Sequence, residues 1–544
     1  MTEEAGFRIE ESDAGYMVKG MDYFRSQPEA KVEIPGKTSK ERRNWAFACL
    51  LVLSLVYGLV EIVPGRFTVT DEVFFKAAGR NWAMTGQWAA PEIVGRLSKG
   101  PPLTEVYFAQ PPLYTFLYGV YARLVGFGPR SCMLYDVLIH LLFVWSAVAV
   151  ARTVYALPWT LSALCGALLV PLGTVGRPDE LGIVLAMWGA VVFRSKIPRR
   201  SSALIGGALL GLCGATSLGA LVFLGPLVMW ELRREGEAGA NKARNISLAA
   251  MGALAAGATC VVPILASHPT AYQQLIAHAG EQPVLLVFVT PQGRNWVIYL
   301  LQVWAGALRY GFGYGALMMG LLTFAVLCWW FDRSHEWAGY TRILFAAVSL
   351  LFLVAVMPGK YFYTWFPGSW LFIACAGVGA EVSRSTSRER RRILLAFASV
   401  VWLAASLPYL RSKVILWTLP ADQSLTTNWK RLRSEIPAGV GVLSSDSWWA
   451  LADRDRVYDA TFSNPGIEAV DYVVLSGNGS GKPGAPANIT WQRNNTDFRL
   501  LENHLNPRPT SFFGFPLSRS GYGFGAYVLE KKTRAQRDEK HPIW

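Results

Sequence analysis

Long apolar blocks, separated by clusters of charged residues, fill most of the chain. Trp45–Val63, Met133–Val150 and Ile246–Ala266 each hold about twenty residues with few or no charges, which is the length of a membrane-spanning helix. At a rise of about 1.5 Å per residue, such a helix matches a hydrocarbon core of about 30 Å. Only a helix satisfies all backbone polar groups inside one such segment. The pattern predicts an α-helical polytopic membrane protein.

The positions of the basic clusters predict about eleven transmembrane helices between residues 45 and 410, the transmembrane domain. A cytosolic N-terminal tail, 1–44, places the Lys/Arg clusters at 194–200 and 384–392 in the cytosol, as the positive-inside rule requires. No cleavable signal is visible before the first apolar run, which fits a cytosolic tail. We expect a multi-pass protein of the plasma (inner) membrane. The expected spans are about 45–63, 130–152, 157–175, 180–193, 203–214, 216–230, 246–267, 312–331, 342–358, 364–382 and 393–410.

Three regions outside these spans have patterns of their own. The first outer loop, 64–129, is amphipathic and broken by Gly and Pro, which predicts two or three short helices along the outer membrane surface. A second outer loop, 268–311, is expected to carry a surface helix. From residue 411 the chain becomes more polar, with short β-branched runs at 440–443 and 472–475. These runs predict a small extracytoplasmic α/β domain over 411–544.

Charge and cysteine content exclude several classes of protein. The net charge of +14 is gathered in clusters that the membrane topology explains, so nucleic-acid binding is not expected. All seven cysteines lie in or beside predicted helices, none follows Cys375, and no pair has CxxC spacing. We therefore expect no disulfide in the C-terminal domain and no metal site. No cofactor is predicted with certainty, and a divalent cation is left open.

Two motifs place acidic residues at the outer ends of helices. Thr70-Asp71-Glu72 follows the first expected span, and Arg177-Pro178-Asp179-Glu180 follows the third. Both are typical of helix starts, where the helix dipole favours carboxylates. A capping carboxylate still presents an oxygen to the membrane surface, so a chemical role is compatible. Arg177 lies at the outer face against the topological bias, which indicates an anionic partner: Asp179, Asp71 or a phosphate.

Two further motifs are individually less informative. Gln110-Pro-Pro-Leu-Tyr114 predicts an extended entry into a helix, since proline suits the first helical turn. Lys360, Tyr361 and Tyr363 are expected at the outer face, where aromatic residues commonly form a membrane-interface belt. Lys360 is less easily explained in that way, because the strong basic clusters lie on the cytosolic side.

In this order, the motifs resemble those of the GT-C membrane glycosyltransferases. The resemblance is carried by Asp71-Glu72, Gly86-Gln-Trp88, Gln110-Pro-Pro-Leu-Tyr114 and Arg177-Pro-Asp179. The nearest pattern is the protein O-mannosyltransferase and aminoarabinose-transferase branch. The resemblance covers residues 45 to about 200 well and 340–380 weakly. The Trp-Trp-Asp-Tyr-Gly sequence of oligosaccharyltransferases is absent, which disfavours transfer of a whole glycan to asparagine.

The resemblance implies a sugar donor carried on a polyprenyl phosphate and an active site at the outer membrane surface. The acceptor would be a lipid, a polysaccharide or a protein. Asp71 matches the catalytic base, and Glu72 would support it. The donor pocket would be lined by Arg177, Asp179 and Lys360, with Tyr361 and Tyr363 beside them.

The residue types fit this chemistry. An inverting transfer needs one carboxylate to accept the proton of the acceptor hydroxyl, whereas the departing phosphate needs only positive charge nearby. One base with cations is the set of residues present, rather than the paired acids of a glycosidase. A transporter or lipid flippase for a polyprenyl-linked or other amphipathic substrate is the alternative, with charges expected near the bilayer midplane. A membrane scaffold or receptor is a third hypothesis.

Overall fold

The computed structural model divides into two units, Met1–Trp45 and Ala46–Trp544, and only the start of one helix is described in the first. The four expected spans between 312 and 410 lie almost wholly outside the described residues. The described segments are 39–63, 70–94, 100–170, 176–232, 239–281, 392, 396, 414, 417–418, 425–444, 448–453, 455–458, 467–477, 498–503, 511–512, 515–516 and 525–531.

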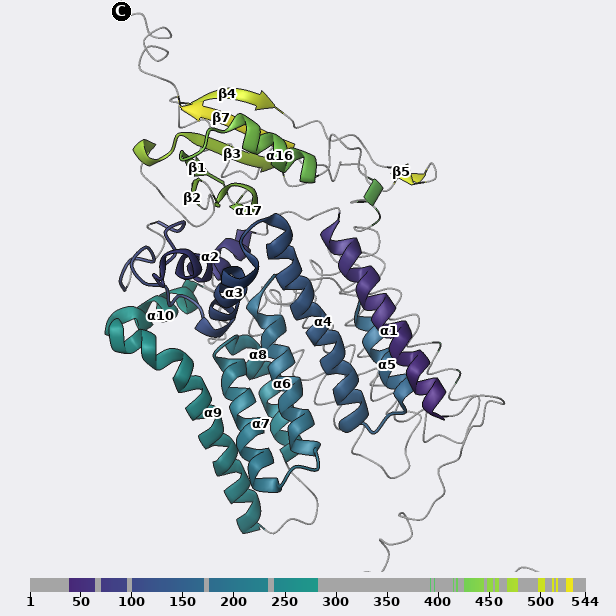
Figure 1. Cartoon of the computed structure of the whole chain (residues 1–544). Coiled ribbons are helices and arrows are strands. Elements are labelled where there is room, and N and C mark those ends of the chain that lie inside the picture. The colour runs from purple at the N-terminus through teal and green to yellow at the C-terminus, as the bar shows by residue number, and fades with distance from the viewer. Residues whose placement is uncertain are drawn as a thin grey trace, which may run out of the picture. The chain divides into compact units, whose positions relative to one another are not determined.

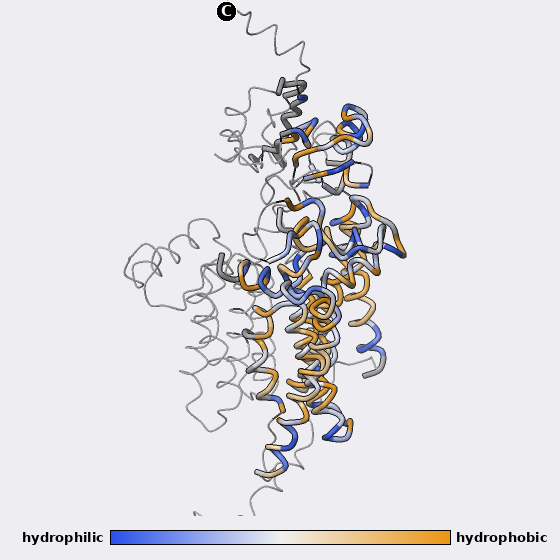
Figure 2. The backbone as a smooth tube through the Cα atoms, turned by 90° about the vertical axis from the view of Figure 1, so that its left-hand side faces the viewer, coloured by the Kyte–Doolittle hydropathy of each residue, from blue (hydrophilic) through white to orange (hydrophobic). Residues whose placement is uncertain are grey.

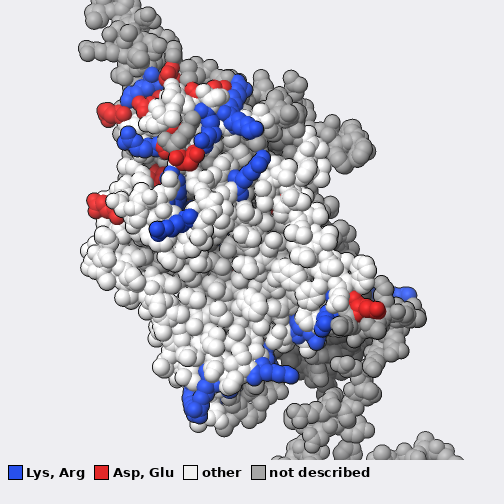
Figure 3. Space-filling model, viewed as in Figure 1, with Lys and Arg blue, Asp and Glu red and all other residues white. Residues whose placement is uncertain are grey.

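Apolar helices form the membrane part of the described chain (Figure 1). Three of them are long and apolar enough to cross a membrane, over Arg43–Ile62, Pro129–Thr153 and Gly239–Ser267. Apolar residues dominate the helical part (Figure 2), and on the face in Figure 3 a wide uncharged band separates charged groups at its two ends. The chain is a membrane protein. In the described residues, the apolar part contains α1 (Ser39–Ile62), α4 (Pro129–Thr153), α5 (Trp159–Leu169), α6 (Pro178–Arg194), α7 (Arg199–Gly214), α8 (Leu218–Leu232) and α9 (Gly239–Ser267).

Some helices extend beyond the expected apolar spans, because the polar residues next to those spans are also helical. α4 and the expected span 130–152 nearly coincide, whereas α1 begins at Ser39 and so includes the end of the tail predicted over 1–44. α9 begins at Gly239 instead of residue 246. Hydropathy identifies the apolar part of a membrane helix. The helix itself continues into the neighbouring polar residues for as long as they favour a helical backbone. The helix expected over 157–175 is described only as α5, with 171–175 outside the described residues.

The Gly-rich segment after residue 200 forms close helix contacts. α7 packs between α6 and α9, and these helices lie side by side in Figure 1. A Cβ at Gly207 would collide with the carbonyl oxygen of Ala249, and one at Gly252 with that of Leu204. Small residues allow this close approach of backbones, which is how membrane helices commonly associate without a hydrophobic driving force. The glycines are therefore packing residues of the α7–α9 pair.

Two short helices occupy the loop between α1 and α4. α2 (Thr70–Thr85) and α3 (Pro112–Val125) agree with the prediction of two or three short helices in this loop. They cross at Gly79 and Gly119, where each glycine lies against the other helix's backbone. The Thr115 hydroxyl also donates a 2.7 Å hydrogen bond to the Phe75 carbonyl. This pair positions the acidic motif at the start of α2.

A buried glutamine attaches the segment that follows α9 to the connection between α2 and α3. A short 3₁₀ turn (Pro269–Ala271) leads into α10 (Tyr272–Glu281), the helix expected in the second outer loop. The Gln274 amide is wholly buried and donates to the carbonyls of Pro101 (2.8 Å) and Val106 (2.9 Å). Its oxygen accepts from the Phe108 amide at 2.7 Å. One side chain therefore replaces water for three backbone groups.

Gln274→Leu should loosen this connection. The substitution keeps similar bulk but leaves buried backbone groups unpaired, at about 1–3 kcal/mol for each group that water cannot reach. We expect a lower unfolding temperature and faster amide hydrogen exchange over 101–108. Gln273→Leu, at the half-buried neighbouring position, is the control. Equal exchange in the two variants would show that the Gln274 contacts do not hold the loop.

The C-terminal part contains a mixed five-stranded sheet in the order β2-β1-β3-β7-β4. β1 is parallel to β2 and β3, and β7 is antiparallel to β3 and β4. β1 and β3 coincide with the two β-branched runs that predicted strands. The elements are α16 (Leu425–Glu435), β1 (Gly441–Leu443), α17 (Trp448–Leu451), β2 (Arg456–Tyr458), a 3₁₀ turn (Ile467–Ala469), β3 (Tyr472–Gly477), β4 (Phe498–Asn503), β5 (Ser511–Phe512), β6 (Phe515–Pro516) and β7 (Gly525–Lys531).

Candidate active site

The first acidic motif opens α2. The helix begins at Thr70, so positions 71 and 72 occupy its first turn, where the helix dipole favours carboxylates. The structure describes the backbone of Asp71 but not its side chain. The Glu72 carboxylate is fully buried, 3.6 Å from the ammonium of Lys76 one turn later. The Glu72 side chain therefore lies in the interior of the protein.

Lys76 joins two carboxylates in a buried cluster. Its ammonium donates to both oxygens of Asp136 on α4, at 2.8 and 2.7 Å, and also faces Glu72. The Tyr114 hydroxyl of α3 donates to Asp136 at 3.2 Å. The ammonium lies 5.5 Å from the ring centroid of Tyr118. Buried charges persist only when they are paired and hydrogen-bonded, so this cluster fixes α2 against α3 and α4 in one arrangement.

The second motif begins α6. Pro178 occupies the first helical turn, and Arg177 before it is extended, as a residue preceding proline prefers. The Arg177 Nε lies 3.5 Å from an oxygen of Asp179, whose other oxygen accepts a hydrogen bond from the Ser217 hydroxyl. Asp179 is therefore an anionic partner of Arg177, and it is one of the three partners proposed from the sequence.

Arg177 brings the two motifs together. Its guanidinium lies over the ring of Phe75, 4.9 Å from the centroid, in a cation–π contact. Phe75 is one helical turn after position 71, so the two positions share a face of α2. The guanidinium therefore lies beside the first turns of α2. We call the region formed by positions 71, 72, 75, 177 and 179 the α2–α6 junction.

α4 supports both sides of this junction. Asp136 and His140 are four residues apart and share a face; Asp136 binds Lys76, while His140 Nδ1 lies 2.5 Å from the Glu180 carboxylate. The other ring nitrogen of His140 lies 3.1 Å from the Val170 carbonyl. Because a carbonyl only accepts, that nitrogen carries a hydrogen, and a second proton must be shared between His140 and Glu180. Asp136 and His140 were not among the predicted site residues, although ionisable residues inside an apolar run are a sequence signal of a functional site.

A second ion pair, partly buried, joins the later part of α2 to the loop that follows it. Arg80 contacts Glu92 at 2.9 Å and also donates to the carbonyl of Ala452, next to α17. Its guanidinium lies 4.8 Å from the ring centroid of Phe127, and that ring meets Trp448 edge-on at 5.0 Å. Arg80 therefore links α2 with the segment that contains α17.

Glu92 should make stability depend on pH. Burial raises the pKa of Glu92 above its ordinary value, although the charge of Arg80 opposes the shift. The folded state then binds a proton at higher pH than the unfolded state, so this contribution to stability falls as pH rises from the ordinary carboxyl pKa towards the raised one. The unfolding temperature of wild type relative to Glu92→Gln should decline over this window. Glu105→Gln, at an exposed position in the same loop, should show no such trend.

Three predicted donor-binding residues, Lys360, Tyr361 and Tyr363, lie outside the described residues and stay predictions. Within the described segments, no three His, Cys, Asp or Glu side chains come close enough to share a metal ion. His268 follows the end of α9, and His278 lies on α10, where its ring packs 4.8 Å from that of Phe74.

The fold is similar to that of solved membrane transferases. No protein-family model and no curated protein matches the sequence. ArnT from Cupriavidus metallidurans bound to undecaprenyl phosphate aligns with a TM-score of 0.50 at 12% identity, over 89% of this chain and 98% of that chain. The apo state of ArnT gives 0.51 at 11% identity over the same shares. An oligosaccharyltransferase from Archaeoglobus fulgidus gives 0.46 at 12% identity, over 81% and 70%.

Proposed function

We propose, for a chain that has the fold of the GT-C membrane glycosyltransferases, the transfer of a sugar from a polyprenyl-phosphate donor to an acceptor hydroxyl at the outer membrane surface. The observation that carries this proposal is the α2–α6 junction, where Arg177 lies beside the first turns of α2. In this proposal, a base at position 71 and the cation of Arg177 act on one substrate. The ArnT structure with bound undecaprenyl phosphate supports a lipid-phosphate donor.

In the proposed reaction, the carboxylate of Asp71 accepts the proton of the acceptor hydroxyl. The hydroxyl oxygen attacks the anomeric carbon from the side opposite the phosphate, so a new glycosidic bond forms as the bond between sugar and phosphate breaks. The polyprenyl phosphate leaves as an anion and keeps the electrons of the broken bond. The configuration at the anomeric carbon is inverted, and no general acid is required.

The remaining residues stabilise the departing phosphate and hold the base. Arg177 and Lys360 supply positive charge where phosphate charge develops, a contribution that is large in a site shielded from water. Asp179, Tyr361 and Tyr363 line the donor pocket. Glu72 has no exposed surface, so it fits a supporting role: its contact with Lys76 fixes the first turn of α2.

This function requires a defined topology. We propose eleven spans in the inner membrane, with the N-terminus in the cytosol and the C-terminal domain outside. The transport alternative expects charges near the midplane, whereas Glu180 lies in the first turn of α6. Its partner His140 lies inside the apolar run of α4, so lipid movement without sugar transfer is measured to separate the two hypotheses.

Purified full-length protein in nanodiscs, supplied with a panel of radiolabelled polyprenyl-phosphate sugars and membrane-extract acceptors, tests the proposal. We expect one label to move to an acceptor, with inversion at the anomeric carbon. Movement of the lipid across reconstituted vesicles without transfer of any label would favour a flippase instead. Retention of configuration in the product would contradict the assignment of a single base.

A further inference from the structure

The start of α8 lies close against the first turns of α6. Gly182 follows Asp179 by three residues, nearly one turn of α6. A Cβ at Gly182 would lie 2.9 Å from the Ala220 Cβ and 3.2 Å from the Ser217 Cβ. The glycine therefore allows the residues around the start of α8 to approach α6 closely. Ser217, the residue before α8, is buried at this contact.

The Ser217 hydroxyl joins the two helix starts. Its oxygen accepts a 3.1 Å hydrogen bond from the backbone N–H of Ala220, as the residue before a helix commonly does. Its hydrogen is donated to Oδ1 of Asp179. The last torsion of an aspartate side chain has a broad minimum, so this hydrogen bond determines how the buried carboxylate is turned. The start of α8 thereby orients Asp179.

The other oxygen of Asp179 faces Arg177. Oδ2 lies 3.5 Å from the Arg177 Nε. Arginine and a carboxylate pair most strongly in a fork, in which two N–H groups meet both oxygens. Because Ser217 holds Oδ1, Asp179 presents one oxygen to the guanidinium. The Ser217 hydroxyl therefore opposes a fork between Asp179 and Arg177.

Such a fork would compete with a phosphate. Phosphate oxygens and carboxylate oxygens bind the same N–H groups of a guanidinium, and the two anions repel each other. The guanidinium of Arg177 also lies over the ring of Phe75, which carries it beside the first turns of α2. The orientation of Asp179 therefore controls how much of the positive charge of Arg177 acts on a phosphate bound there.

The start of α3 holds the segment that contains Ser217. Prolines at 111 and 112 have no N–H, so Leu113 carries the first backbone N–H of α3, which has no partner within the helix. It donates a 2.9 Å hydrogen bond to the carbonyl of Ala215, two residues before Ser217. The Gln110-Pro-Pro-Leu-Tyr114 motif thus fixes the turn between α7 and α8.

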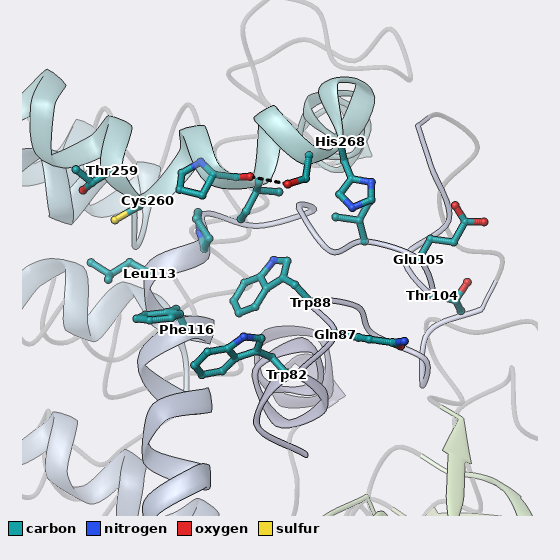
Figure 4. Close-up of a pocket in the computed structure, with 15 residues that line it drawn as sticks. Trp82, Gln87, Trp88, Thr104, Glu105, Leu113, Phe116, Thr259, Cys260 and His268 are labelled. Carbon is teal, nitrogen blue, oxygen red and sulfur yellow. Dashed lines mark hydrogen bonds between the residues drawn. The ribbon is translucent and has the colours of Figure 1, made fainter. Parts of the chain in front are cut away.

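On its other side, the start of α3 borders a pocket. The pocket has a volume of about 950 Å³ and lies between the end of α2, the start of α3 and the end of α9. Figure 4 shows Leu113 and Phe116 in its wall, with Trp82 and Trp88 facing them. At 1.5 Å per residue, Trp82 is about 16 Å along α2 from position 71, so the pocket is separate from the α2–α6 junction. Because α3 faces open space there, its contact with Ala215 contributes to its placement.

We propose that Ser217 is a positioning residue of the transferase: by holding one oxygen of Asp179, it keeps the Arg177 guanidinium directed at the donor phosphate. This inference rests on the proposed function and adds to it a residue outside the sequence motifs. Ser217 acts through Asp179 and does not touch the substrate.

Binding of dodecyl phosphate to the full-length protein in detergent tests the role without requiring catalysis. Ser217→Ala lets the Asp179 carboxylate turn both oxygens towards Arg177, and should raise the Kd about three- to tenfold, as expected for coupled neighbours. Ser217→Thr keeps the hydroxyl and should bind nearly as wild type does. Thr216→Val is the matched control, because its buried hydroxyl donates to the Leu212 carbonyl instead, at 2.8 Å. It should leave the Kd unchanged.

A double-variant cycle separates positioning from an effect on the start of α8. Asparagine at position 179 cannot form the charged fork with Arg177. In an Asp179→Asn background, Ser217→Ala should therefore leave the Kd unchanged. A loss of equal size in both backgrounds would show that the effect does not pass through Asp179, and would overturn the proposal.

Arg177→Met separates this inference from the proposed function. If Arg177→Met weakens binding but Ser217→Ala does not, the positioning role is wrong and the donor site stands. If Arg177→Met leaves the Kd unchanged, the donor site and the role of Ser217 both fall. In transfer assays, Ser217→Ala should lower kcat/KM for the donor by a factor similar to its change in Kd, with the KM for the acceptor unchanged.

Discussion

Asp71→Asn should abolish sugar transfer, lowering kcat/KM by about 10²- to 10⁴-fold, the usual contribution of a general base. Asparagine keeps the size and polarity of the side chain but cannot accept the hydroxyl proton. Position 71 is in the first turn of α2, one turn before Phe75, whose ring contacts the Arg177 guanidinium. Donor binding should persist, because the cations that hold the phosphate are unchanged. Transfer of labelled sugar and donor binding are measured on the same preparation.

The control replaces a carboxylate in an equivalent local position. Glu41 lies in the first turn of α1, as Asp71 lies in the first turn of α2. Glu41→Gln removes the same favourable interaction with the helix dipole, and should leave transfer unchanged. Equal losses in the two variants would indicate an effect on helix stability. Wild-type turnover in Asp71→Asn would remove the base from the mechanism.

Lys76→Met should have the largest effect on stability. The ammonium is fully buried between Glu72 and Asp136, so its removal leaves two buried carboxylates without their shared cation. Breaking a buried pair by removing one partner costs about 3–5 kcal/mol. We expect a strongly lowered unfolding temperature in nanodiscs and little folded protein at physiological temperature.

Two further variants distinguish pairing from loss of bulk. Adding Asp136→Leu to Lys76→Met removes one of the uncompensated charges, and should restore part of the stability. Arg431→Met breaks the i,i+4 ion pair with Glu435, whose side chains are 41% and 26% exposed, and should cost about 1 kcal/mol or less. A double variant less stable than Lys76→Met would contradict the role given to Lys76.

The length of the apolar blocks predicted the described membrane helices well, because a helix must match the thickness of the bilayer. The expected spans 130–152 and 180–193 differ by only one or two residues at each end from α4 and α6. Hydropathy could not predict the start of α9, because the largely polar segment Gly239–Asn245 is also helical. A polar flank outside the hydrocarbon has no burial signal, and its helix follows from continuity with the span.

The candidate site was only partly predictable. The motifs at 71–72 and 177–179 were visible as helix starts with acidic residues, but the contact between Phe75 and Arg177 depends on the tertiary structure, which brings the residue before α6 against α2. No local pattern encodes that contact. The i,i+4 spacing of Glu72 and Lys76 was readable from the sequence, but the pairing of Lys76 with Asp136, sixty residues away, could not be read from spacing. The pocket beside Trp88 likewise combines three distant segments.

Photocrosslinking of the donor lipid tests the proposed site most directly. A polyprenyl phosphate with a diazirine next to its phosphate is bound to the full-length protein, and the labelled peptides are identified by mass spectrometry. The α2–α6 junction predicts labels over 70–75 and 176–180, with loss of both when Arg177 is replaced by Met. Labels confined to 194–200, where α6 ends and α7 begins, would place the phosphate at the opposite helix ends and contradict the proposed chemistry.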